Sequence, residues 1–317
     1  MRRCDRRDFL RLAAGAAADA GALLAARAPL LRALEVPAPP APTLRLGFVP
    51  AHAGGAAADA VVEAARRGVE LGAAEAEQSA RLLGRAVAWR TLADVAAART
   101  AVAAREVDVL LGGFDAATCL ALADAAAAAG VPFFNLGCRA DALRNADCRR
   151  HAFHVEASET MYRLALETAG NPPSGPTGAV RIVLWHPSLA RFGADQLNDR
   201  YRARHGEGMP AAAWAGWMAA KVALEGWLRA GRTPLVDHLA RPATQFDGHK
   251  GWPLSFRPWD HQLRQPLYAV LSAGGAARVE RVTREVPAMG VAEAPSRELL
   301  DSIAGPASAS ACRWGAS

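Results

Sequence analysis

The first half of the chain alternates short apolar runs with longer, alanine-rich segments. The apolar runs are four to six residues long, too short for helices, and they favour buried strands. These predicted strands are 44–49, 86–89, 107–111, 131–136 and 152–155. The segments between and after them predict helices over 56–72, 92–104, 116–129 and 158–169. Such regular alternation predicts an α/β fold, with a parallel sheet flanked by helices on both faces.

The loops that follow the first, third and fourth predicted strands are the expected place for a ligand. Ligands of parallel α/β folds bind beyond the carboxyl ends of the strands, which here means 50–55, 112–118 and 136–144. Glycines in these loops let the backbone approach a ligand, and the helix that follows each loop points amide groups at anions. Gly112 and Gly113 form neither the spaced glycine pattern of a dinucleotide site nor a phosphate-binding loop with its lysine. We therefore expect a ligand site without a cofactor.

The second half of the chain is less regular. Three prolines and three glycines interrupt the pattern at 170–178. A strand is expected at 181–185, helices at 194–204 and 211–230, and strands around a turn at 246–256 and 266–270. Tryptophans at helical spacing in 211–230 indicate core packing. His249 and His261 stand near aspartates, and we interpret them as structural residues because no further metal ligand follows at a useful spacing.

The order of these segments resembles a known family, the type I periplasmic substrate-binding proteins of ABC transporters, of the leucine/isoleucine/valine kind. The matching stretches are 68–71 through 83–87, 107–113, 131–135, the FDGHKGWPLSF run at 246–256, and 266–270. Together they cover most of the chain. Three stretches, 143–148, 185–189 and 246–268, are most similar to the subgroup associated with PQQ-dependent alcohol dehydrogenase systems.

The resemblance implies which residues contact a ligand. Family contacts come from loops after the first, third and fourth strands, here His52, Phe114, Asp115, Gly137, Cys138 and Arg139. Family contacts in the second lobe have no counterpart in this sequence. An ordinary solvated loop residue is the alternative interpretation for each position.

The chain departs from the family where the second α/β lobe should be. About 40 residues, 170–209, stand in its place, enough for one strand and one helix. We therefore expect a type I periplasmic-binding fold with its second lobe largely missing. The expected division is an export signal at 1–36, a proline-rich linker at 37–43, a first α/β lobe at 44–169, a reduced remnant of the second lobe at 170–209, return helices and hinge strands that complete the first lobe at 210–290, and a C-terminal tail at 291–317.

The N-terminus carries a candidate export signal. Paired arginines, Arg6 and Arg7, precede Phe9, Leu10 and a weakly apolar run at 12–26, which resembles a twin-arginine (Tat) signal. An ordinary amphipathic first helix is the alternative, because Asp5 and Asp19 depart from the usual signal. The first interpretation predicts a periplasmic protein.

The net charge bears on nucleic-acid binding, and the cysteine positions bear on which disulfides can form. The net charge is +6, but seven arginines against four acidic residues in 1–36 supply half of it, and no basic groove with interleaved aromatics appears in the remainder. We therefore expect no nucleic-acid partner. In an oxidising compartment Cys148 would pair with either Cys138 or Cys312, whereas Cys119 lies in an apolar helix and is expected to be buried.

The sequence thus predicts a non-enzymatic periplasmic component that presents a small polar solute, such as an amino acid, amide or short organic acid, to an ABC permease in the inner membrane. No Ser/His/Asp set, paired carboxylate or metal motif indicates catalysis. Two alternatives stay open: an accessory protein of a periplasmic quinoprotein dehydrogenase, and a defective product of an internal deletion.

Overall fold

The computed structural model describes residues 41–169, 180–273, 276–282, 300–301, 307–312 and 314. The predicted export signal at 1–36 lies outside these residues, as do most of the linker and the glycine- and proline-rich stretch at 170–178. The domain division proposed above therefore stays a prediction at those positions. Within the described helices, none combines the length and the apolar character needed to cross a membrane.

Five parallel strands form the central sheet, in the order β2-β1-β3-β4-β5. Its strands are β1 (Thr43–Val49), β2 (Ala86–Thr91), β3 (Val109–Gly112), β4 (Phe133–Asn135) and β5 (Ala152–His154). In register, Leu46 of β1 lies between Trp89 of β2 and Val109 of β3. The central strands are almost wholly buried, as their continuous apolar runs require. This sheet confirms the predicted α/β class.

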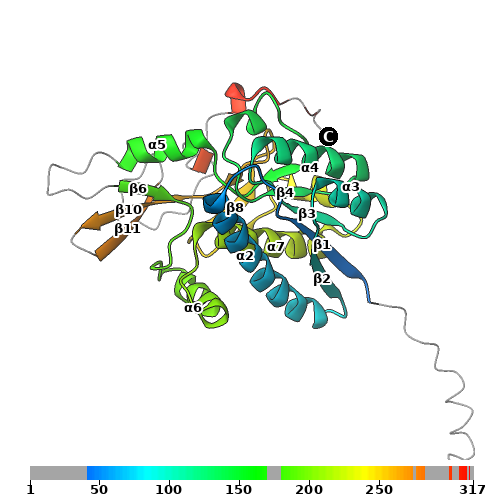
Figure 1. Ribbon diagram of the computed structural model, residues 1–317, viewed down its shortest axis with the longest axis horizontal. Helices are drawn as coiled ribbons and strands as arrows, with labels where there is room; N and C mark the ends of the chain where they lie inside the picture. The colour runs from blue at the N-terminus through cyan, green and yellow to red at the C-terminus, as the bar shows by residue number, and fades with distance from the viewer. Residues whose placement is uncertain are drawn as a thin grey trace, which may run out of the picture. The chain divides into compact units, whose positions relative to one another are not determined.

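Helices cover both faces of the sheet (Figure 1). On one face, α2 (Ala56–Arg81) packs on α7 (Ala211–Ala230), and on the other α3 (Val95–Ala103) packs on α4 (Ala116–Ala129). The sequence analysis predicted that the first helix ends at residue 72, which is nine residues before its actual end at Arg81. Ala73, Ala76 and Ala80 continue the buried face, and the helix ends before Gly84, whose φ of +64° is left-handed.

The contact between α2 and α7 depends on two glycines. A Cβ atom at Gly68 would lie 1.9 Å from the carbonyl oxygen of Ala213, and one at Gly216 would lie 2.2 Å from the carbonyl oxygen of Ala65. No side chain fits either position, so the two backbones touch directly. This close approach brings the tryptophans of α7 into the core.

The described residues of the stretch 170–209, where a reduced second lobe is predicted, form one strand and one helix, as the length of the stretch predicts. Strand β6 (Val180–Val183) and α6 (Ala194–His205) lie there. Strand β6 does not join the parallel sheet. It pairs antiparallel with β10 (Leu267–Ala273), which pairs with β11 (Ala276–Val282) in a separate three-stranded sheet.

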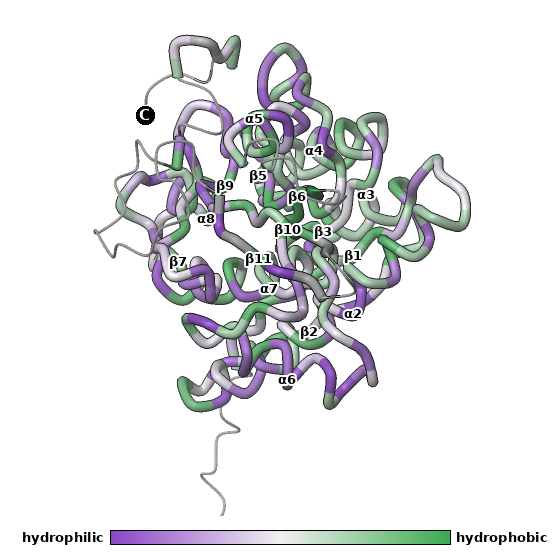
Figure 2. Tube along the Cα trace, turned by 90° about the vertical axis from the view of Figure 1, so that its left-hand side faces the viewer, coloured by the Kyte–Doolittle hydropathy of each residue, from purple (hydrophilic) through white to green (hydrophobic). Residues whose placement is uncertain are grey.

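The remaining elements are short. They are η1 (Asp141–Arg144), α5 (Glu159–Ala169), α8 (Leu235–Leu239), β7 (Phe246–Asp247), β8 (Pro253–Phe256), β9 (Leu263–Arg264) and η2 (Ala307–Ala309). Strands β7, β8 and β9 form a small antiparallel sheet around the turn that the sequence predicts. Figure 2 shows hydrophobic positions gathered on β1 and β3 of the central sheet and on β10 of the antiparallel sheet.

The tryptophans and histidines of the second half are packing residues. Trp185 and Trp214 stack at 5.9 Å between ring centroids and are buried, which confirms the predicted core role of the stripe. His261 stacks on Phe153 at 4.4 Å, and His249 stacks on Trp217 at 5.4 Å. In the described part of the chain, no group of three or more His, Cys, Asp or Glu side chains could hold a metal ion.

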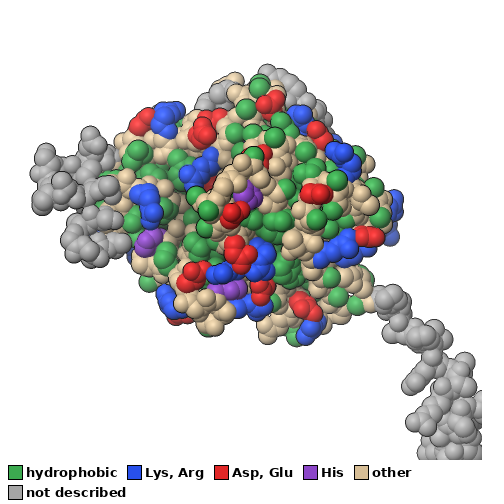
Figure 3. Space-filling model, in the orientation of Figure 1, with side chains coloured by type: hydrophobic (Ala, Val, Ile, Leu, Met, Phe, Trp, Pro, Cys, Tyr) green, Lys and Arg blue, Asp and Glu red, His purple; other side chains and the backbone are tan. Residues whose placement is uncertain are grey.

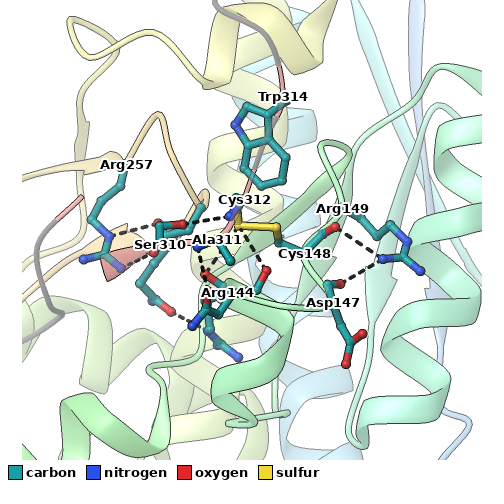
Figure 4. Close-up of a disulfide and its surroundings, with 12 residues drawn as sticks. Arg144, Asp147, Cys148, Arg149, Arg257, Ser310, Ala311, Cys312 and Trp314 are labelled. Atoms are coloured by element: carbon teal, nitrogen blue, oxygen red, sulfur yellow. Dashed lines mark hydrogen bonds and ion pairs between the residues drawn. A yellow bond between two sulfur atoms is a disulfide. The ribbon is translucent and has the colours of Figure 1, made fainter. Parts of the chain in front are cut away.

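A disulfide ties the C-terminal tail to the body (Figure 4). Cys148 is bonded to Cys312, and the indole nitrogen of Trp314 donates to the carbonyl of Pro258 at 2.9 Å. Of the two pairings left open, Cys138 with Cys148 is therefore wrong. The physical reason is that Cys138 lies buried among the helices α3 and α4, as does Cys119.

Candidate functional site

The candidate site lies where the strand order of the parallel sheet reverses. Strand β1 is followed by α2 and β2 on one side, whereas β3, on its other side, leads through α4 to β4. The loops after β1 and β3 therefore stand at this reversal point on the carboxyl edge of the sheet, where ligands of such folds bind. His52 belongs to the first loop, and Phe114 and Asp115 belong to the second.

Asp115 joins these two loops. One oxygen of its carboxylate accepts hydrogen bonds from the backbone N–H of Ala53 at 3.1 Å and from the hydroxyl of Thr118 at 2.8 Å. The other accepts from the backbone N–H of Thr118, so that Asp115 is the N-cap of α4. Partial burial opposes ionisation, but these hydrogen bonds hold the pKa of Asp115 below its ordinary value. The carboxylate is thus a negative group fixed at the reversal point.

His52 is engaged at both ring nitrogens. Its Nδ1 accepts from the backbone N–H of Gly54 at 3.1 Å, which leaves the proton on Nε2. Nε2 lies 2.9 Å from the carboxylate of Asp59 in the first turn of α2. His52 therefore fixes the loop after β1 on its helix and offers a ligand its ring rather than a free nitrogen.

Phe114 and Gly137 come into contact across neighbouring loops. A Cβ atom at Gly137 would lie 2.5 Å from Cδ1 of the Phe114 ring, and that ring also packs edge-on against Phe48 at 6.1 Å. Phe114 is partly exposed, so its ring presents an apolar surface at this edge of the sheet. Gly137 is required because any larger residue would displace this ring.

Cys138 faces inward and is not presented to solvent. The side-chain oxygen of the buried Asn135 accepts from its N–H at 2.9 Å, and the side-chain nitrogen of Asn135 donates to its carbonyl at 2.8 Å. Cys138 belongs to the same buried cluster as Cys119. The residue shapes the loop after β4, and a direct contact between its thiol and a ligand stays a prediction.

Arg139 lies over a buried acid that the sequence analysis did not select. Its guanidinium stands 4.1 Å above the ring of Tyr162, and its Nε is 3.7 Å from the carboxylate of Glu156. Glu156 follows β5 and its side chain is 6% exposed, whereas that of Arg139 is 51% exposed. The Glu156 carboxylate accepts from the Tyr162 hydroxyl at 2.6 Å and from the backbone N–H of Ala157 at 2.9 Å.

Two opposing effects act on the pKa of Glu156. Burial raises its pKa, and this outweighs the nearby positive charge of Arg139 and the hydrogen bond from Tyr162. A second cation close to the carboxylate would therefore be favourable. The sequence does carry a signal, because Glu156 is the acidic residue closest to the carboxyl end of β5, but an acid just before a helix is also typical of simple dipole complementation.

Arg144 braces this part of the site from inside. The buried guanidinium donates to the carbonyls of Cys138, Ala140 and Glu156 at 2.8 to 3.1 Å, and to the side-chain oxygen of Gln262 at 2.8 Å. One side chain therefore holds the loop after β4 against the loop after β5. That fixes the spacing between Arg139 and Glu156.

Comparisons with known proteins bear on the fold. No protein-family model matches the chain. None of the curated proteins compared with it matches either. Solved structures do match, and eight of them have 11–15% sequence identity to this chain.

Three of these structures illustrate the match. An amino acid ABC transporter substrate-binding protein from Pseudomonas fluorescens has a TM-score of 0.65 at 13% identity, over 86% of this chain and 100% of its own. The branched-chain amino acid transporter substrate-binding protein LivJ from Streptococcus pneumoniae, in complex with isoleucine, has a TM-score of 0.61 at 14% identity, over 76% and 99%. An ABC transporter solute-binding protein from R. palustris, in complex with benzoate, has a TM-score of 0.61 at 15% identity, over 86% and 100%. The chain therefore has the α/β fold of periplasmic ABC-transporter substrate-binding proteins.

Proposed function

We propose that this protein binds a small solute carrying both an ammonium and a carboxylate group, as an amino acid does, and leaves it chemically unchanged. The observation that carries the proposal is the buried carboxylate of Glu156, 3.7 Å from the half-exposed guanidinium of Arg139 at the carboxyl edge of the sheet. Burying a carboxylate costs free energy, and a cationic partner offsets part of that cost. The fold supports the proposal, since solute binding is what the similar structures are named for.

The pair suggests how such a solute would bind. The solute's ammonium group would take the place of Arg139 beside Glu156 and supply the positive charge that favours the ionised carboxylate. Arg139, thus released, would pair with the solute's carboxylate. Phe114 would cover the apolar part of the solute.

The cellular role follows from the fold and the N-terminal residues, and it is part of the same proposal. We propose that the chain is exported to the periplasm by its twin-arginine-type signal and passes the solute to an ABC permease in the inner membrane. Amides and short organic acids are the other solute classes proposed. Binding would not need a complete second lobe if β6, α6 and β10 cover the candidate site instead.

A second candidate role rests on the stretches similar to the PQQ-associated subgroup. We propose, as the alternative, an accessory protein of a periplasmic PQQ-dependent alcohol dehydrogenase system that no longer closes on a solute. One strand and one helix at 180–209 favour it, because a small remnant offers a ligand less enclosure. Binding of a purified quinoprotein dehydrogenase, with no response to any solute, would support this alternative.

Nucleic-acid binding is not proposed. Figure 3 shows basic and acidic side chains interspersed on the face drawn there, with hydrophobic ones between them. Several of the arginines pair with acidic residues, including Arg45 with Asp108 and Arg204 with Glu70. Such a surface lacks the one-sign field that tracks a phosphate backbone.

The experiment is a set of thermal unfolding measurements with amino acids, their amides, and the analogues that lack the amine or the carboxylate. A ligand at about 100 times its Kd stabilises the native state by about 2.7 kcal/mol, which raises the midpoint by roughly 5 °C. We expect the intact amino acid to raise the midpoint most. If the analogue without the amine raised the unfolding midpoint as much as the intact amino acid, a role for Glu156 in binding the ammonium group would be contradicted.

A further inference from the structure

We propose that Lys250 anchors a small flap, formed by α5, β6, β10 and β11, and that this flap separates from the rest of the protein only when the hydrogen bonds of the Lys250 ammonium group break. Because the anchor lies behind Glu156, Lys250 is also a positioning residue for the candidate site. The anchor does not depend on the proposed function, whereas its effect on a bound solute does.

The flap packs mainly on itself. Helix α5 contacts all three strands of the antiparallel sheet, and among the described helices and strands none of these four elements has an extensive contact outside the group. Figure 1 shows the four elements together on the left of the view. Three segments of the described chain lead from the flap to the rest of the protein: one between β5 and α5, one after β6, and one between β9 and β10. Units below about 40 residues rarely fold unaided, so one helix and three short strands need this attachment.

Lys250 lies where these connecting segments meet. Its side chain is fully buried and extends from the turn between β7 and β8. Its Nζ donates to the carbonyl of Leu184, directly after β6, at 2.9 Å, and to the carbonyl of Pro266, directly before β10, at 3.1 Å. A third hydrogen bond, of 2.8 Å, reaches the side-chain oxygen of Gln265. An ammonium group has three donors, so all of them are used here.

Gln265 extends the contact to the remaining segment. Its side-chain nitrogen donates to the carbonyl of Val155 at 2.7 Å, and Val155 directly follows β5. On the flap itself, the guanidinium group of Arg281 in β11 donates to the backbone carbonyl of Lys250 at 3.1 Å. One residue is therefore bonded to β11 and, directly or through Gln265, to all three connecting segments.

Aromatic rings from both parts of the protein contact the same ammonium group. Nζ lies 3.9 Å from the ring centroid of Trp214 on α7 and 5.5 Å from that of Tyr268 on β10. A cation near an aromatic face is attracted by the ring. In the part of the chain that the structure describes, Lys250 forms no ion pair, so its partners are backbone carbonyls, an amide and rings. These are groups that fix the course of the chain.

Separation of the flap would break this set of bonds. A buried cation without hydrogen-bond partners is strongly unfavourable, so the bonds can break only as water reaches Lys250. The ammonium group and the amide groups of the flap should therefore become accessible in the same event.

The anchor also fixes the candidate site from behind. Val155 precedes Glu156, whose carboxylate lies 3.7 Å from Arg139, and α5 of the flap begins three residues after Glu156. Arg144 holds the same segment through the carbonyl of Glu156 at 2.8 Å. Where the proposed function holds, loss of the Lys250 contacts should weaken solute binding although neither charged group of the site is changed.

The first test uses the two lysines of the chain, Lys221 and Lys250. Brief acetylation of the full chain with acetic anhydride, followed by peptide mass spectrometry, gives the rate at which each amine is modified. The Lys221 side chain is 26% exposed and is the internal control that should react first. We expect Lys250 to be protected, relative to the unfolded chain, to the same degree as the amides of β6 and β10 are protected from deuterium exchange.

The second test compares the hydrogen exchange of the wild type, Lys250→Met and Lys221→Met. Methionine keeps an unbranched apolar side chain and removes the ammonium group. We expect the flap of Lys250→Met to exchange at least about 10-fold faster than that of the wild type, since loss of one hydrogen bond from a charged group has an effect of this size. At the same urea concentration β1 and β3 should stay more protected than the flap, and Lys221→Met should exchange like the wild type.

Several outcomes would overturn the proposal. Acetylation of Lys250 as fast as that of Lys221, or a protection of Lys250 that differs from that of the flap, would show that the flap opens independently of this residue. Unchanged exchange of the flap in Lys250→Met, or loss of protection in the flap and the parallel sheet together, would make Lys250 an ordinary core residue. The acetylation of the wild type decides even where Lys250→Met does not fold. None of these measurements uses a solute, so failure here is distinct from failure of the proposed function.

Discussion

At the scale of single residues, His261 shows how a buried titratable group ties stability to pH. Its side chain is 1% exposed, between Phe153 and Trp314, and burial lowers its pKa to about 3. The unfolded chain, with an ordinary histidine pKa near 6.5, binds a proton first as the pH falls. Stability from this residue is therefore complete above about pH 6.5 and is lost progressively from there down to about pH 3.

We expect His261→Asn to remove this dependence. Asparagine tolerates the positive φ of 52° at this position, and it does not titrate. Between pH 6.5 and pH 3, each pH unit changes the unfolding free energy of the wild type by about 1.4 kcal/mol through this residue. From pH 6.5 to pH 5, the variant should therefore lose about 2 kcal/mol less unfolding free energy than the wild type. Urea unfolding at the two pH values measures it. Equal losses in both proteins would show that His261 is not the titrating group.

Residues of the candidate site were only partly predictable. Loops at the ends of parallel strands follow from sheet order, so His52, Phe114, Asp115, Gly137 and Arg139 lie near the expected edge. The pairing of Arg139 with Glu156 joins different loops through Tyr162, and no spacing rule encodes such a contact. In the same way, the inward turn of Cys138 depends on the buried Asn135.

At the scale of elements, the contact between α2 and α7 shows what patterning can and cannot predict. Alanine-rich sequence predicted both helices because apolar and small residues recur at helical spacing. It could not show that Gly68 and Gly216 sit at the point of closest approach, because in sequence they look like ordinary helix-weakening glycines. Their role appears when the partner backbone is in place.

We expect Gly68→Ala to destabilise the protein despite the better helix propensity of alanine. The added methyl group would meet the carbonyl of Ala213 at 1.9 Å, and overpacking of this kind costs about 1–3 kcal/mol or more. Gly55→Ala is the matched control, since no atom lies within 4 Å of the added carbon. Urea unfolding should give a loss of about 2 kcal/mol for the first variant and little change for the second. A variant at Gly68 as stable as the wild type would mean that the helices lie farther apart.

At the scale of the whole molecule, the disulfide between Cys148 and Cys312 closes a loop across 164 positions. The sequence left its pairing open, because the partners are distant and only the fold brings them together. Once formed, the bond holds the tail, where Trp314 packs near His261. Long closed loops restrict the unfolded chain strongly.

We expect Cys312→Ser to lower the unfolding free energy by about 2–4 kcal/mol while the cooperative transition is kept. The C-terminal tail should also become the first site of limited proteolysis. Wild-type protein in strong reductant is the control and should behave in the same way. If neither the stability nor the cleavage pattern changes, the tail is held by other contacts.

The parallel sheet and its covering helices could be predicted because apolar runs and turn residues are local signals. The arrangement of the second half could not. Its strands pair across long separations, as β6 does with β10, and the parallel pattern of the first half gives no indication of an antiparallel sheet. The similar structures support this fold at identities too low for sequence to carry a function.

The central claim is that Glu156 and Arg139 bind the two charged ends of one solute. The most direct measurement is calorimetric titration of the wild type, Glu156→Gln and Glu159→Gln with the amino acid that stabilises the wild type most. Glu159 begins α5, is exposed, and serves as the matched control. We expect Glu156→Gln to weaken binding by about 10- to 100-fold, in line with about 1.5–3 kcal/mol for a hydrogen bond to a charged group, and Glu159→Gln to bind like the wild type. Equal affinities for all three proteins would contradict the account.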